Sequence, residues 1–153
     1  MNIFVLDYNP VSAARMQCDK HVVKMPLETA QILCCAHPVG TAPYKRTHYN
    51  HPCSKWSRLA KENYQWLIEH GLALCDEYNF RYGKVHQSKR VISWCQEHIF
   101  RLDFVQIKKS RFVLCFDEKY IIGNAVCSYR NYYKKEKTKI AQWNKGRSKP
   151  SWY

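Results

Sequence analysis

Three side chains suited to acid–base chemistry occur at helical spacing near the start of the chain. His21, Lys24 and Glu28 are three and four residues apart, so one face of a helix would carry all three. An imidazole, an amine and a carboxylate held close together shift one another's pKa and can move protons. The alternative is an exposed helix face on which Lys24 and Glu28 form an ordinary ion pair, worth about 0.2–0.5 kcal/mol. Both interpretations stay open at this point.

Three further segments, Tyr44–Cys53, Arg81–His86 and Tyr129–Lys135, mix rings with cations. Cations neutralise phosphates and aromatic rings stack on unpaired bases, so such mixtures indicate a nucleic-acid or nucleotide ligand. The histidine-rich first segment adds His51 as a candidate catalytic group. The candidate contact residues are His48, Asn50, Arg81, Tyr82, Lys84, His86, Arg130, Tyr132, Tyr133, Lys137 and Trp143.

The same histidines allow a metal site as a minority possibility. One thiolate and three imidazoles form a sensible tetrahedral zinc set, here Cys18, His21, His48 and His51, with Cys53 as a spare. The chain has no CxxC pair, and the main expectation is therefore a protein without a cofactor.

Composition narrows the class of protein. The 153 residues are 46% hydrophobic and 24% charged, which predicts one folded domain over residues 1–153. The net charge is +13, and the segment from Tyr129 to Tyr153 carries eight basic residues and one acid. This excess favours an anionic partner such as nucleic acid.

The chain also predicts where the protein works. No apolar run approaches the length of a membrane span, and Met1 is not followed by a basic leader. We therefore expect an intracellular monomer that is neither secreted nor membrane-bound, in the host cytoplasm or nucleus if the source is a virus. The eight cysteines are irregularly spaced, so most are expected to be reduced core residues.

Hydrophobic periodicity predicts a mainly α fold: one compact helical domain with a short extended N-terminal segment and a basic, aromatic C-terminal helix and tail. The first half of the chain is expected to form an extended segment Met1–Asp7, a helix from Pro10 to Leu33, a loop His37–Pro52 and a helix Ser54–Tyr78. Asn9 would cap the first helix, which would be kinked or broken at Pro26, and Gly83 in a left-handed conformation would mark the end of the second. The second half is expected to form a helix from Ser88 to His98, a short strand Arg111–Phe116, a basic helix Ala125–Trp143 and an irregular tail Arg147–Tyr153.

Several motifs resemble those of known families. MNIFVLD, CDKHVVKM, NHPC, RYGKVH and YRNYY are similar to motifs of a family of small proteins from phages and large DNA viruses. The chain also resembles the pyrimidine-dimer DNA glycosylase/AP lyases, the phage endonuclease V family. The shared features are the seven-residue spacing of His21 and Glu28, the aromatic-basic segment Tyr129–Lys135 with Trp152-Tyr153, and the segments Asn50–Pro52 and Glu77–Lys89, which are similar to bacterial members.

This resemblance implies a small basic helical enzyme that acts on double-stranded DNA with a damaged or modified pyrimidine. It implies that Glu28 is the catalytic carboxylate, that His21 orients it or a phosphate, and that an amine attacks C1′ of the damaged nucleotide. The family uses the α-amine exposed by removal of Met, whereas Asn2 here would leave Met1 in place. The nucleophile is therefore the amine of Met1 or that of Lys24, or the lyase step is absent.

Another departure is Leu27, which stands where the family has an arginine. Two other functions stay open: an enzyme for nucleotides or modified bases with its active site in the histidine-rich loop, and a non-catalytic viral nucleic-acid-binding protein.

Overall fold

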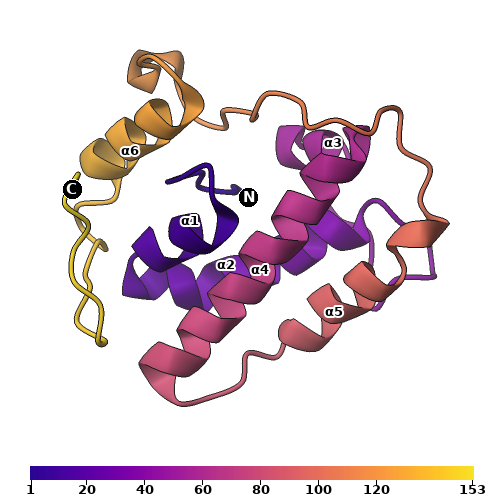
Figure 1. Cartoon of the computed structure of the whole chain (residues 1–153), viewed down its shortest axis with the longest axis horizontal. Coiled ribbons are helices and arrows are strands. Elements are labelled where there is room, and N and C mark those ends of the chain that lie inside the picture. Colours follow the sequence, from indigo (N-terminus) through magenta and orange to yellow (C-terminus); the bar gives the residue numbers. More distant parts are fainter.

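The computed structural model describes all 153 residues and contains helices and irregular segments but no strand. Figure 1 shows the arrangement of the six α-helices, which confirms the predicted mainly helical class. They are α1 (Pro10–Met16), α2 (Asp19–Cys34), α3 (Pro52–Leu59), α4 (Lys61–Tyr82), α5 (Lys89–Glu97) and α6 (Ala125–Glu136), with 3₁₀ turns at Ile99–Arg101 and Glu118–Tyr120. None of these helices has the length and apolar character that a membrane span requires.

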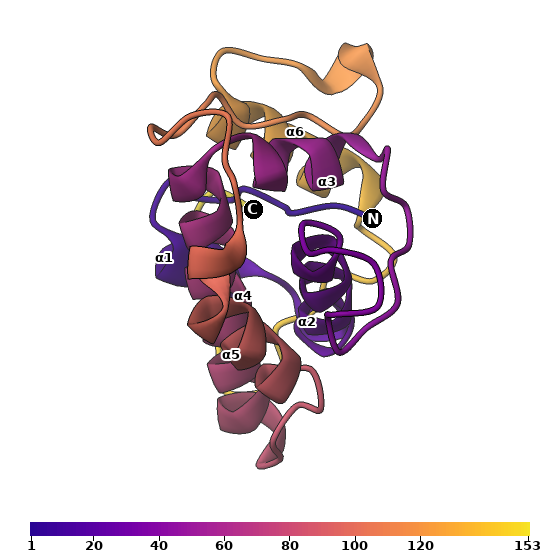
Figure 2. The ribbon, with the colours of Figure 1, turned by 90° about the vertical axis from the view of Figure 1, so that its right-hand side faces the viewer.

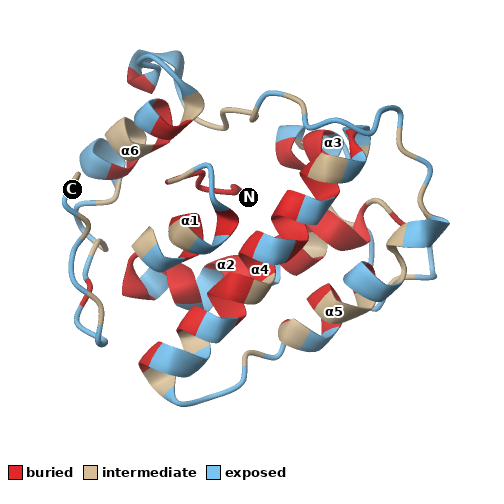
Figure 3. Ribbon diagram, viewed as in Figure 1, coloured by how far each residue is buried: buried red, intermediate tan, exposed pale blue.

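The long helix α4 is the centre of the fold. It contacts α1, α2, α3 and α5, and buried residues recur along its whole length (Figure 3). A Cβ added at Gly71 would come within 2.6 Å of Thr29 Cγ2 and 3.0 Å of Ile92 Cδ1. Glycine at this position therefore allows α2, α4 and α5 to pack closely.

The N-terminal segment is extended and inserted into the core, as Figure 2 shows. Ile3–Leu6 is buried, and Arg130 of α6 donates to the carbonyl of Leu6 at 2.8 Å. The start of the chain is therefore fixed between α2, α6 and the segment 111–116, rather than left free.

The first helical region breaks earlier than predicted. Asn9 caps α1 as expected, accepting from the amide of Ser12. The break lies at Gln17 and Cys18, while Pro26 sits inside the continuous helix α2. Of the predicted kink or break at Pro26, the break is therefore wrong. The chain breaks at Gln17 and Cys18 instead, where Arg81 donates to the carbonyls of Arg15 and Gln17 that the end of α1 leaves without helical partners.

The helix predicted from Ser54 to Tyr78 is two helices. Ala60 separates α3 from α4 in an extended conformation with φ −133° and ψ 142°. Gln106 pairs with it from a distant part of the chain, accepting from the amide of Lys61 at 3.0 Å. Gly83 ends α4 in the left-handed conformation, with φ 64°, as predicted.

Two C-terminal predictions are also wrong. The segment 111–116 makes no backbone–backbone hydrogen bond and is not a strand. Helix α6 ends at Glu136 instead of Trp143, because the following chain turns back to the α1–α2 junction. There the amide of Asp19 donates to Gln142 and the indole of Trp143 donates to the carbonyl of Met16.

Candidate active site

A polar pocket of about 200 Å³ lies where the N-terminal segment meets α2 and α6. It is lined by Met1, Asn2, Phe4, His21, Lys24, Met25, Glu28, Cys115, Tyr132 and Lys137. The predicted group His21, Lys24 and Glu28 thus borders one pocket, and the N-terminal amine joins it. A larger hollow of about 590 Å³ beside Lys109–Phe112 has neither a carboxylate nor a histidine in its lining.

Glu28 receives two amines and one amide. Its Oε1 lies 3.1 Å from Nζ of Lys24, and its Oε2 lies 3.9 Å from the N-terminal nitrogen of Met1. The backbone N–H of Asn2 donates to Oε2 at 3.1 Å. The glutamate is buried, whereas the Lys24 side chain is 69% exposed. Glu28 is thus held by three nitrogen groups from two parts of the chain, α2 and the N-terminal segment.

His21 forms part of the pocket wall and makes no hydrogen bond to Glu28. Its ring stacks on Phe4 with centroids 4.4 Å apart. The Tyr133 hydroxyl accepts from the amide of Cys18 at 2.9 Å and is hydrogen-bonded to Nδ1 of His21 at 2.8 Å. Burial, followed by the charges of Lys137 and Lys24, lowers the pKa of His21 to about 3. The imidazole is therefore neutral near pH 7 and cannot bind a phosphate as a cation.

Phe4 has an unusual backbone conformation for a bulky residue, with φ 42°. This conformation costs a non-glycine residue strain energy and persists only where the surrounding structure holds it. Its ring lies between His21 and Tyr132, nearly parallel to Tyr132 at 8° and with centroids 6.4 Å apart. Lys137 Nζ lies 4.8 Å from the Tyr132 ring centroid and 5.8 Å from that of Phe4. Rings and an amine thus face the pocket together.

The histidine-rich loop contributes no residue to the lining of this pocket, although His51 lies near it. His51 caps α3, and its Nδ1 accepts from the amide of Cys53 at 3.1 Å. The pKa of His51 is lowered mainly by burial and then by the nearby N-terminal amine. His51 therefore lies near the amine but outside the residues that line the pocket.

The predicted zinc set does not come together. Cys18 is buried beside Tyr133, and His48 is exposed and pairs with Thr47. The group with suitable spacing is instead His51, Cys53 and Cys115. Its third member was not recognised in the sequence because it is far from the other two along the chain.

The candidate DNA-contact residues fall into two groups. Three are buried and cannot act as predicted: Arg81 is fully enclosed in ion pairs, Tyr133 is 0% exposed and Trp143 is 9% exposed. Exposed or half-buried residues remain accessible, namely His48, Asn50, Tyr82, Lys84, His86, Arg130, Tyr132 and Lys137. His86 contacts the carbonyl of Val23 at 3.0 Å, which places the turn containing Lys84 beside α2.

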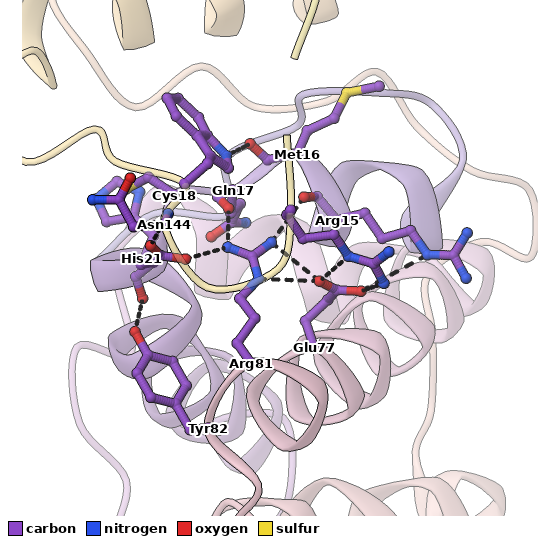
Figure 4. Close-up of polar contacts among 12 residues, drawn as sticks. Arg15, Met16, Gln17, Cys18, His21, Glu77, Arg81, Tyr82 and Asn144 are labelled. Carbon is purple, nitrogen blue, oxygen red and sulfur yellow. Dashed lines mark hydrogen bonds and ion pairs between the residues drawn. The ribbon is translucent and has the colours of Figure 1, made fainter. Parts of the chain in front are cut away.

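Arg81 belongs to a buried ion network that ties the tail to the helices (Figure 4). Its guanidinium pairs with Asp19 at 3.0 Å and Glu77 at 3.1 Å. Arg147 of the tail reaches Glu77 at 2.6 Å. Only the four-residue spacing of Glu77 and Arg81 was visible in the sequence. The network is structural and lies at the α1–α2 junction rather than in the pocket.

Comparison with known proteins adds one finding. The family model described as pyrimidine dimer DNA glycosylase matches residues 1–91. No curated protein and no solved structure matches the chain. The matched residues include His21, Lys24, Glu28 and His51, whereas α6 and Cys115 lie outside the match.

Proposed function

The chain belongs to the pyrimidine dimer DNA glycosylase family, and we propose that it removes a damaged or modified pyrimidine from double-stranded DNA and then cleaves the strand as an AP lyase. The observation that carries this proposal is the position of Glu28. Its carboxylate lies between two amines, Met1 N at 3.9 Å and Lys24 Nζ at 3.1 Å, at the edge of one pocket.

The amine acts first in the proposed mechanism. Its unprotonated nitrogen attacks C1′ of the damaged nucleotide, and the bond from C1′ to the base breaks. The base leaves with the electron pair and takes up a proton. The nitrogen then passes a proton to solvent, the bond from C1′ to O4′ breaks as O4′ takes up a proton, and a protonated imine remains between the nitrogen and C1′.

Glu28 acts during and after this step. Its negative charge stabilises the positive charge that develops on the sugar. It then accepts the proton from C2′, and the 3′ phosphate departs by β-elimination. The neutral His21 stacks on Phe4 and is hydrogen-bonded to Tyr133, and so shapes the pocket wall.

Met1 is the proposed nucleophile and Lys24 the alternative. As a class, α-amines are less basic than lysine side chains, so a larger fraction is unprotonated at neutral pH. The nitrogen of Met1 also belongs to a segment fixed in the core, whereas the Lys24 side chain is 69% exposed. A fixed nucleophile loses less conformational freedom when it attacks.

The basic surface would hold the duplex. Lys24 and Lys137 border the pocket, and the net charge of +13 favours the phosphate backbone over a neutral ligand. In the loop that leads to His51, exposed Tyr49 lies between Arg46 and Arg58, at 4.4 and 3.8 Å from its ring centroid. This arrangement offers two cations and a ring that could contact the nucleic-acid backbone and an unpaired base.

Borohydride trapping tests the proposal. The protein, with a free Met1 amine established by intact mass, is incubated with duplexes that carry one abasic site or one thymine dimer. We expect a covalent adduct on both, mapped to Met1. Lys24→Arg should keep the adduct, and Lys20→Arg, an exposed change one turn away, serves as its control. An adduct on Lys24 would transfer the role to that residue. Binding without adduct or cleavage would contradict the enzymatic proposal.

A further inference from the structure

A second reactive group lies next to the pocket and has no part in the mechanism above. His51, Cys53 and Cys115 each bring one potential ligand atom, and these atoms lie within 4.8 Å of one another. The two sulfur atoms are 3.2 Å apart. Cys53 is buried and the other two residues are half-buried, so the group is enclosed but open to a small ion.

The distance between the two sulfur atoms is closer to that of two thiolates on one metal ion than to that of a disulfide. A disulfide needs sulfur atoms about 2.0 Å apart. Two thiolates on a tetrahedral zinc ion, each about 2.3 Å from the metal, are separated by about 3.8 Å. The observed 3.2 Å requires only a small outward shift of Cys53 and Cys115.

We propose that His51, Cys53 and Cys115 bind one zinc-class divalent cation, with a water molecule as the fourth ligand. Two thiolates and an imidazole are the ligand types that such a cation prefers. The proposal is independent of the proposed glycosylase activity, because it rests on residues that have no role in that reaction.

The charges and protons balance. Each thiol releases one proton and its sulfur donates an electron pair to the cation, so two thiolates and one divalent ion carry no net charge. The site would therefore place no additional positive charge beside the Met1 amine. The ring of a neutral imidazole has one nitrogen with an available lone pair. In His51 the lone pair on Nδ1 accepts from the Cys53 amide when no metal is bound. Metal binding replaces that hydrogen bond with a metal–nitrogen bond.

The cation would fix a segment that the backbone leaves loosely attached. Residues 111–116 make no backbone–backbone hydrogen bond. Cys115 would join this segment to α3, while its carbonyl accepts from Nδ2 of Asn2 at 3.1 Å. Asn2 in turn donates to Glu28. The proposed site thus stabilises the wall of the pocket without touching the reacting atoms.

Metal titration of the reduced, chelator-treated full chain tests this inference. We expect one Zn²⁺ per chain by elemental analysis after dialysis. Co²⁺ should give the intense visible bands of tetrahedral coordination and a thiolate charge-transfer band. Both cobalt bands should disappear in Cys115→Ser. In His51→Ala the affinity for Co²⁺, measured by titration of these bands, should fall at least about tenfold. Cys127→Ser, which changes an exposed cysteine outside the group, should behave as the wild type.

Folding is checked separately by circular dichroism, and Zn²⁺ should raise the Tm of the wild type but not of Cys115→Ser. His51→Ala, which removes a half-exposed ring, keeps the test decisive if Cys115→Ser does not fold. Absence of tetrahedral cobalt bands in the wild type would overturn the proposal. Zinc retained in both variants, or a Cys53–Cys115 disulfide in place of metal binding, would do so as well.

Discussion

Glu28 is the only carboxylate that lines the pocket, and its replacement separates chemistry from binding. Glu28→Gln keeps the shape and the hydrogen bond from the Asn2 amide but removes the negative charge. We expect strand cleavage and imine trapping to fall at least about 100-fold, with DNA affinity nearly unchanged in a gel-shift assay. Glu97→Gln, a change of an exposed carboxylate in α5, is the control. An equal loss of binding and cleavage would show that Glu28 has a structural role.

Replacement of Arg81, in contrast to that of Glu28, should change the stability of the protein through a buried ion network that lies outside the pocket. Its side chain is 0% exposed and pairs with Asp19 and Glu77. Arg81→Met would leave two buried carboxylates without this partner, which costs about 3–5 kcal/mol of unfolding free energy. Urea unfolding measures this loss. Arg15→Met removes a cation 3.8 Å from Glu77 that is 61% exposed, and should cost under about 0.5 kcal/mol. Similar losses in both variants would contradict a special role for Arg81.

At the scale of elements, local signals predicted the caps of helices better than the breaks inside a predicted helix. Asn9-Pro10 and Gly83 act through their own conformations, so their effect can be read from adjacent residues. The break at Ala60 depends on pairing with Gln106, and the end of α1 depends on Arg81. Partners so distant along the chain leave no periodic signal near the break.

In the candidate site, too, contacts within one helix could be predicted from the sequence, whereas contacts between distant segments could not. One helical face accounts for His21, Lys24 and Glu28, so their spacing alone predicted them as neighbours. The approach of Met1 to Glu28 and the meeting of Cys53 with Cys115 require chain segments that only the tertiary fold brings together. Tyr133 and Trp143 were predicted to contact DNA because aromatic residues in a basic segment look alike whether buried or exposed.

The close packing of α2, α4 and α5 around Gly71 allows the effect of a larger residue at this position to be predicted. Gly71→Ala should improve the helix propensity of α4 by about 1 kcal/mol. It also places a methyl group 2.6 Å from Thr29 Cγ2, and overpacking of this kind costs about 1–3 kcal/mol. We therefore expect a net loss of stability in urea unfolding. Thr29→Ser removes the contacted methyl group and should recover part of the loss in the double variant. No recovery would place the strain elsewhere.

For the whole molecule, three histidines in the core predict sensitivity to acid. Burial is the largest cause that lowers the pKa of His21 and His70 to about 3 and of His37 to about 4, from 6.5. Below pH 6.5 the unfolded chain takes up protons that the folded chain does not. Stability is thus full above this pH and falls as the pH decreases toward the folded values.

The size of the effect can be measured directly. Three additional protons in the unfolded state correspond to a slope of at most about 4 kcal/mol per pH unit near pH 5. Urea unfolding from about pH 7 to about pH 4.5 should show this decrease. His70→Gln, which keeps a polar side chain near Gln17, should reduce the slope by about 1.4 kcal/mol per pH unit. A free energy of unfolding that stays constant over this range would mean that these histidines are protonated in the folded protein.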